Sequence, residues 1–166
     1  MPNKCKSLSP ISLYIHIPFC KKKCNFCDFN AYEGIEEMID DYEQAIIKEF
    51  QLWRPTLENK EVVSIFIGGG TPSRVPAVKL KKLIKIIEES INLNKNAEIT
   101  AEINPDDIPD WDIIDLQNSG INRLSIGIQS FIDDELDLLD RQYTGEFAVK
   151  QIKYLQNHGF RNINLD

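Results

Sequence analysis

Short apolar runs rich in β-branched residues alternate along this chain with segments whose apolar residues recur at helical spacing. The runs span residues 12–18, 62–67, 97–103, 123–128 and 162–165. The segments between them span residues 35–53, 76–91, 109–118, 133–139 and 147–158. This alternation is typical of a parallel sheet with right-handed crossovers, because parallel strands need a long return connection. We therefore predict an α/β fold built on a parallel sheet.

Glycines, cysteines and polar residues gather where the predicted strands end. Three cysteines follow the first strand, and Gly68-Gly69-Gly70 follows the second. Glu102 ends the third strand, Gln129 lies just past the fourth, and Asp166 ends the fifth. Active sites in parallel α/β folds form at the carboxyl ends of the strands. The sequence therefore predicts a single site on this rim.

The three cysteines at the first strand end, Cys20, Cys24 and Cys27, are separated by gaps of four and three residues. Thiolates prefer soft metals, and iron–sulfur clusters are held by cysteine sulfur. Three such ligands on a cluster of four irons leave one iron without a protein ligand. An open iron is free to bind something else, so this pattern indicates a reactive cluster rather than a simple electron carrier.

A structural zinc site is the main alternative, and it usually needs four ligands. Cys5, His16 and His158 are the available fourth partners, but Cys5 lies in a polar tail and the chain has no second CxxC pair. A disulfide framework fits less well still, because this chain has few cysteines and no signal peptide. We therefore expect a reducing, cytoplasmic location.

Charge and hydropathy exclude two further classes of function. The net charge is −7 and the pI is near 4.9, which argues against a nucleic-acid partner. No apolar run approaches the roughly 20 residues of a membrane helix, so we expect no transmembrane segment. The densest basic run, Lys21-Lys22-Lys23, lies inside the cysteine loop. We interpret it as a solvated loop rather than a docking site for anionic groups or a reductase.

These motifs resemble the radical S-adenosylmethionine (SAM) superfamily. In that superfamily a CxxxCxxC loop holds a 4Fe–4S cluster, and an aromatic residue precedes the last cysteine of the loop. Phe26 is that aromatic residue in this chain. In that superfamily the cluster reduces SAM to a 5′-deoxyadenosyl radical, and a glycine-rich turn bonds the SAM amino group. The glycine turn and five longer segments are similar to the oxygen-independent coproporphyrinogen III oxidase family and its heme chaperone relatives. The turn is Gly68-Gly69-Gly70-Thr71-Pro72, and the segments are 12–20, 64–73, 102–105, 121–131 and 159–166.

The resemblance implies a partial parallel (β/α) barrel of radical SAM type. We expect residues 1–11 to form an N-terminal tail and residues 12–166 to form the core domain. Family members continue to a sixth strand and a C-terminal domain. We therefore expect this chain to be an N-terminal portion, truncated after about the fifth strand and incomplete at its C-terminal end.

The resemblance also assigns site residues, although it identifies no catalytic residue. Cys20, Cys24 and Cys27 would ligate the 4Fe–4S cluster. The positions that fall where the family contacts SAM, together with one position in the glycine turn, are Tyr14, Phe26, Gly69, Gly70, Thr71, Glu102, Gln129, Arg141 and Asp166.

The segment after the third cysteine separates the two branches of this family. The oxidases carry a further cysteine two positions later, where this chain has Phe29. The sequence Cys27-Asp28-Phe29-Asn30 is similar to the heme chaperone branch, which would bind heme as cargo and pass it to an acceptor protein, with a separate electron donor. A departure from the family is Tyr143, which stands in place of a histidine.

Two alternative functions stay open. One is oxidative decarboxylation of coproporphyrinogen III in porphyrin and heme biosynthesis, which would make the protein an enzyme. The other is a non-functional truncated remnant or a purely structural metal module.

Overall fold

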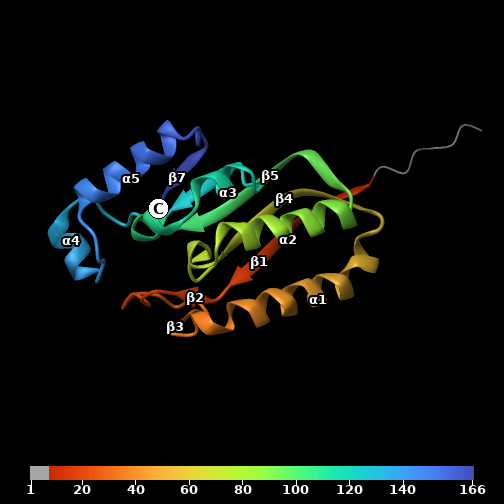
Figure 1. Ribbon diagram of the computed structural model, residues 1–166, viewed down its shortest axis with the longest axis horizontal. Helices are drawn as coiled ribbons and strands as arrows, with labels where there is room; N and C mark the ends of the chain where they lie inside the picture. Colours follow the sequence, from red (N-terminus) through yellow and green to blue (C-terminus); the bar gives the residue numbers. More distant parts are fainter. Residues whose placement is uncertain (1–7) are drawn as a thin grey trace, which may run out of the picture.

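The computed structural model describes residues 8–166, so Cys5 and most of the expected tail lie outside the described residues. Its main sheet has five strands in the order β1-β4-β5-β6-β7, and every neighbouring pair is parallel. The predicted α/β fold with a parallel sheet is confirmed (Figure 1). The strands are β1 Ser9–Ile17, β4 Lys60–Gly69, β5 Leu93–Ile103, β6 Arg123–Ile126 and β7 Ile163–Leu165.

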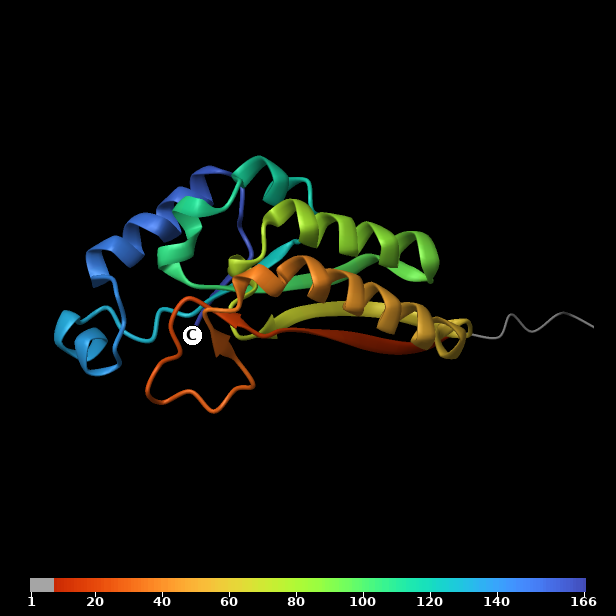
Figure 2. The same cartoon turned by 60° about the horizontal axis from the view of Figure 1, so that its bottom comes forward.

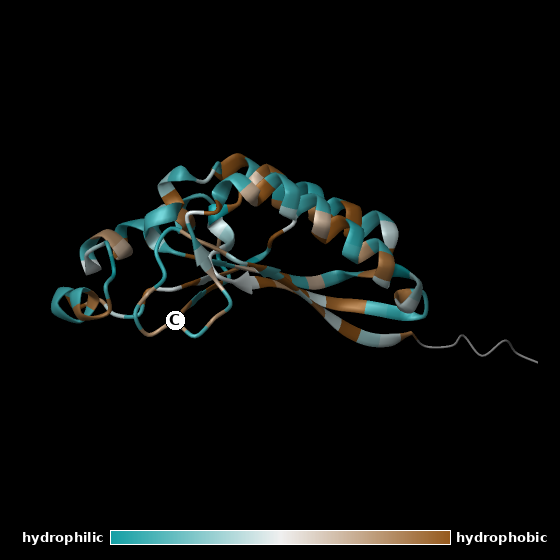
Figure 3. Ribbon diagram, turned by 90° about the horizontal axis from the view of Figure 1, so that it is seen from below, coloured by the Kyte–Doolittle hydropathy of each residue, from teal (hydrophilic) through white to brown (hydrophobic). Residues whose placement is uncertain are grey.

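Helices connect successive strands of this sheet. The α-helices are α1 Ile39–Leu57, α2 Ala77–Ser90, α3 Ile113–Gln117, α4 Asp133–Leu138 and α5 Gly145–Asn157. Short 3-10 turns precede some of them, namely η1 Glu36–Met38, η2 Pro72–Arg74 and η3 Pro105–Asp110. Viewed along the sheet, α1 and α2 lie on the same face, and no helix within residues 8–166 covers the opposite face (Figure 3). No helix among residues 8–166 is long and apolar enough to cross a membrane.

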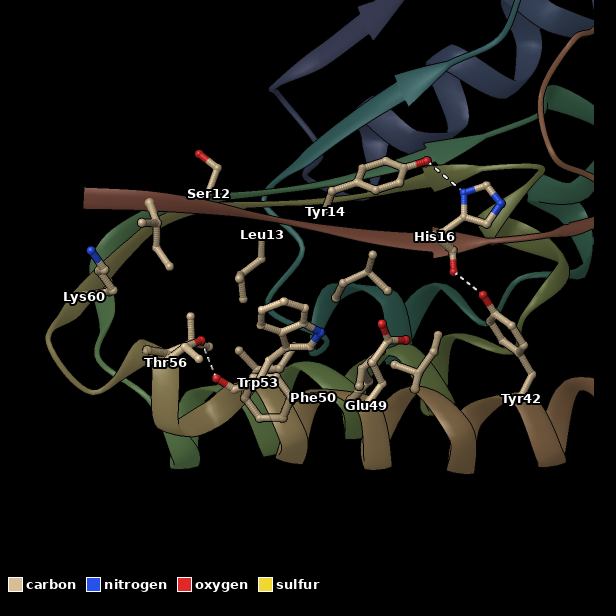
Figure 4. Close-up of a pocket in the computed structure, with 16 residues that line it drawn as sticks. Ser12, Leu13, Tyr14, His16, Tyr42, Glu49, Phe50, Trp53, Thr56 and Lys60 are labelled. Carbon is tan, nitrogen blue, oxygen red and sulfur yellow. Dashed lines mark hydrogen bonds between the residues drawn. The ribbon is translucent and has the colours of Figure 1, made fainter. Parts of the chain in front are cut away.

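The hydrophobic core lies between the sheet and its helices, with α2 at its centre and contributions from α3, α4 and α5. Ile65 and Leu124 of the sheet and Leu80 and Ile84 of α2 are each no more than 1% exposed. Helix α1 is different, because none of its residues is fully buried. A groove of about 730 Å³ separates it from β1, and Trp53 of α1 lies across this groove from β1 (Figure 4). The central strands and α2 therefore form the rigid part of the scaffold.

Several predicted boundaries shift in the structure: the strand predicted over residues 97–103 begins at Leu93, and the helix predicted over residues 35–53 spans Ile39–Leu57. The helix predicted over residues 109–118 is divided, because η3 ends at Asp110 and α3 begins only at Ile113. Asp112 causes the restart, since its side chain accepts hydrogen bonds from the amides of Ile114 and Asp115 at 2.9 Å and caps α3. Strand β1 begins at Ser9, so residues 9–11 belong to the sheet and not to the expected tail.

A small two-stranded sheet, which the sequence did not predict, brackets the cysteine loop. Phe19–Cys20 (β2) pairs in parallel with Tyr32–Glu33 (β3). The loop between them leaves the body of the protein and returns to it (Figure 2). These short strands fix both ends of the loop that carries Cys24 and Cys27.

A buried carboxylate, Asp107 of η3, holds the turn after β4 in place. It is 1% exposed and accepts hydrogen bonds from Ser73 Oγ and from Arg74 Nη1, each at 3.0 Å. Arg74 also bonds Glu36 at 3.3 Å. A buried charge is tolerated only when it is paired and hydrogen-bonded. This network therefore joins three loops that approach the same rim of the sheet.

We predict that Asp107→Ala lowers the free energy of unfolding by about 3 kcal/mol, because Arg74 would lose its buried partner. Asp110→Ala is the matched control, since Asp110 is an exposed carboxylate on the same turn. Chemical denaturation measures both values. Equal, small losses in the two variants would contradict this role for Asp107.

Candidate functional site

A cavity of about 340 Å³ opens at the carboxyl ends of the parallel strands. Of the twelve residues predicted for the site, Tyr14 is the exception: it does not line this cavity, and its side chain projects from the side of β1 opposite α1 (Figure 4). The other eleven line the cavity together, and they are Cys20, Cys24, Phe26, Cys27, Gly69, Gly70, Thr71, Glu102, Gln129, Arg141 and Asp166. The strand-end rule thus gave the correct place for the cysteines, the glycine turn, Glu102, Gln129 and Asp166. Phe26, Thr71 and Arg141 came from the family resemblance, and the roles of all eleven stay predictions.

The cysteines occupy different environments in the cavity. Cys20 is buried, and its sulfur lies 3.5 Å from the Thr71 hydroxyl. Cys24 and Cys27 are half-buried, and Arg141 Nη1 donates to the Cys24 sulfur at 3.4 Å. Within residues 8–166, no three His, Cys, Asp or Glu side chains are close enough to hold a metal ion as they stand. The thiols therefore share one cavity but are not yet gathered into a coordination geometry.

We predict that Cys20 is the slowest of the three thiols to be alkylated in the metal-free protein. Burial raises the pKa of its thiol, and the buried sulfur is shielded from reagent. Mass spectrometry after timed iodoacetamide treatment measures each site. Thr71→Val is an informative companion, because it removes the hydroxyl beside Cys20 without changing the side-chain shape. Modification of Cys20 at the rate of Cys24 would contradict the described burial.

The glycine turn at the end of β4 is packed too tightly for side chains. A Cβ on Gly69 would lie 2.5 Å from the His16 ring, and the Gly69 φ of +120° is unfavourable for other residues. A Cβ on Gly70 would lie 2.7 Å from the carbonyl oxygen of Phe19. The Gly70 amide donates to Ile17 O at 2.7 Å. The turn thus lets β4 approach the start of the cysteine loop.

His16 holds this turn from the side of β1. Its Nε2 lies 2.8 Å from the carbonyl oxygen of Asn30, which only accepts, so Nε2 carries the proton. In the neutral ring Nδ1 then accepts from the Tyr14 hydroxyl at 3.1 Å. Tyr14 therefore reaches the site only through His16. Neither His16 nor His158 lines the cavity, so neither serves as a fourth metal ligand there.

We predict that Gly69→Ala destabilises the protein by about 2 kcal/mol or more, because it combines backbone strain with a clash against His16. Gly34→Ala is the control: Gly34 also has a positive φ, +68°, but nothing lies within 4 Å of its Cβ position. Thermal unfolding compares the two. Equal losses would show that strain alone matters and that the contact with His16 does not.

Glu102 faces this turn from the neighbouring strand β5. Its Oε2 accepts a hydrogen bond from the Gly69 amide at 3.0 Å. Burial raises the pKa of this carboxyl and the charge of Asp166 adds to the rise, although the Gly69 bond opposes it. A carboxyl with a raised pKa holds its proton more tightly when folded. Its contribution to stability is therefore present at low pH and is lost as the pH rises through the folded pKa.

Arg141 lines the cavity from the segment after α4. Its Nη2 donates to the carbonyl oxygen of Gly127 at 2.8 Å and lies 3.4 Å from Asn104 Oδ1. The Arg141 Nε is buried and has no hydrogen-bond partner in the part of the chain that the structure describes. Tyr143, which replaces the expected histidine, is buried and donates to the carbonyl oxygen of Gly127 or Ile128, at 2.8 and 2.9 Å.

Two uncharged polar residues of the cavity were not predicted for the site, and neither were Lys22 and Lys23 of the cysteine loop. Asn104 Nδ2 donates to Thr71 Oγ1 at 3.2 Å, which connects the glycine turn to Arg141. Ser125 Oγ donates to Asp166 Oδ2 at 2.8 Å and holds that carboxylate at the rim. Asn104 follows β5 directly, so the strand-end rule alone was sufficient to find it. Ser125 lies inside β6 and carries no comparable signal.

The match to a family model settles which superfamily contains this chain. The model of the radical SAM superfamily matches residues 14–166. The chain belongs to the radical SAM superfamily. The solved structure of the Escherichia coli coproporphyrinogen III oxidase HemN, described as a radical SAM enzyme, superposes with a TM-score of 0.84 at 31% identity. This match covers 96% of this chain and 37% of that one, and it confirms the predicted partial barrel.

Curated relatives carry two different functional names. The chain is 39% identical to the heme chaperone HemW of Buchnera aphidicola subsp. Schizaphis graminum over 160 residues, 96% of this chain and 42% of that protein. It is 33% identical to the oxygen-independent coproporphyrinogen III oxidase of Salmonella typhimurium, covering 95% of this chain and 35% of that protein. The chain therefore spans less than half the length of these radical SAM relatives.

Proposed function

We propose that residues 12–166 form the cluster- and SAM-binding core of a radical SAM protein of the heme chaperone type. The observation that carries this proposal is the convergence of the cysteine loop, the glycine turn and four polar side chains on one cavity. Those side chains are Glu102, Gln129, Arg141 and Asp166. They come from the ends of β5 and β7 and from the connection between β6 and β7, so the fold itself gathers them.

The donor atoms present fit a 4Fe–4S cluster. Cys20, Cys24 and Cys27 would hold three of its irons, because thiolates are the usual ligands of such clusters and no other cysteine among residues 8–166 competes. When bound, such a cluster supplies an electron for reductive cleavage of the SAM sulfonium. Arg141 places positive charge against Cys24, which would compensate the thiolate charge.

The other lining residues are suited to a SAM molecule. Arg141 lines the cavity, where its guanidinium would pair with a ligand carboxylate. The amides of Gly69, Gly70 and Thr71 are already bonded, at 2.7–3.0 Å, so carbonyl oxygens are left to accept from a ligand amino group. Glu102 and Asp166 would accept from ribose hydroxyls or an amino group. Phe26 and Gln129 would contact the rest of the ligand.

The chaperone branch is favoured over the oxidase branch by Phe29. This residue lines the cavity and is 63% exposed, in the position where the oxidases carry a further cysteine. We propose that the whole protein binds heme as cargo in the cytoplasm and passes it to an acceptor protein. A separate electron donor would reduce the cluster.

Anaerobic reconstitution with iron and sulfide tests the cluster. We predict about four irons per chain, and a loss of most of this iron in Cys20→Ser, Cys24→Ser and Cys27→Ser. Cys5→Ser is the matched control and is expected to retain full loading. Equal loading in all four variants would contradict the assignment of ligands.

Heme titration of the complete protein tests the chaperone function, with anaerobic coproporphyrinogen III turnover measured in parallel. Stoichiometric heme binding without turnover is the predicted result. Turnover would establish the oxidase function as the second candidate, which the similarity to HemN favours. The absence of both heme binding and turnover would contradict both functions. A structural or non-functional role would then remain.

A further inference from the structure

The lysine run inside the cysteine loop makes specific contacts. Lys22 Nζ bonds Asp140 Oδ1 at 2.6 Å, and Lys21 Nζ lies 3.5 Å from Asp106 Oδ2. Lys23 Nζ donates to the carbonyl oxygen of Phe29 at 2.9 Å, within the loop itself. The sequence alone indicates a solvated loop for this run, but its lysines make specific contacts. Each of its first two lysines reaches a carboxylate from a different strand-end connection.

We propose that Lys22 and Asp140 form an electrostatic latch that positions the cysteine loop, with Lys21 and Asp106 as a second, weaker point of attachment. Between the short strands β2 and β3 the loop contains no helix or strand. Few backbone bonds hold it, so its opening costs little free energy. A single ion pair therefore changes the closed population of this loop more than it changes global stability.

The latch acts next to a cysteine. Asp140 precedes Arg141, whose guanidinium contacts the Cys24 sulfur at 3.4 Å. Lys22 lies two residues before Cys24. The segment after α4 thus holds the loop at two adjacent points, once at Lys22 and once at Cys24. Closing the pair brings Cys24 to the guanidinium before any cluster is present.

The backbone of Asp140 supports this role. Its φ is +58°, in the left-handed region that favours glycine and that aspartate also tolerates. Glycine would also fit this turn, but it would offer Lys22 no carboxylate.

A double-mutant cycle in the metal-free protein tests the latch. We expect Lys22→Met and Asp140→Asn each to raise the rate of Cys24 alkylation, and of amide exchange over residues 21–31, by about two- to fivefold. The double variant should show no further increase, because the two side chains act as one pair. Lys48→Met, at an exposed lysine of α1 that makes no ion pair among residues 8–166, is the control and should change nothing.

Asp140→Gly separates the latch from a role in the turn. It relieves the backbone conformation but removes the carboxylate, so we expect a looser loop with an unchanged or higher melting temperature. Unchanged loop exchange in Asp140→Gly, or additive effects in the double variant, would overturn the proposal. These measurements use neither cluster nor heme, so their failure is distinct from failure of the proposed function.

Discussion

The parallel pairing of β1 with β4 is the constraint on which the site depends. The register sets Ile17 beside Gly69. Backbone hydrogen bonds then join the two segments beyond the ends of these strands. The Gly70 amide bonds Ile17 O and the Thr71 amide bonds Phe19 O, both at 2.7 Å. This extension brings Thr71 against Cys20. Only glycine fits at this approach, since any Cβ on Gly70 would meet the β1–β2 backbone.

The same rim then collects contributions from strands that are distant in sequence. Glu102 of β5 bonds the glycine turn, and Asn104 connects Thr71 to Arg141. Ser125 of β6 fixes Asp166, which follows β7. The rigid centre of the sheet thus positions charged groups around a loop that has little structure of its own. A rigid sheet edge beside a loop with little secondary structure suits a site in which the loop would close around an inorganic group.

Much of this arrangement follows from the sequence. Alternating apolar runs and helical segments predicted the sheet, and the position of each polar residue at a strand end predicted one rim. Tyr14 was the exception, because alternation along β1 places it on the face of His16 but does not give the distance to the cavity. The break at Asp112 was missed because a capping residue inside an apolar pattern ends one helix and starts another. The contacts of Lys21 and Lys22 depend on tertiary pairing, which no local pattern records.

The central claim is that Cys20, Cys24 and Cys27 hold a four-iron cluster whose remaining iron is open to SAM. The most direct measurement is electron paramagnetic resonance of the reconstituted, reduced chain with and without SAM. The account predicts a 4Fe–4S signal whose g values change on addition of SAM, and a smaller change in Arg141→Met. A signal indifferent to SAM would contradict the claim that this cavity joins cluster and cofactor.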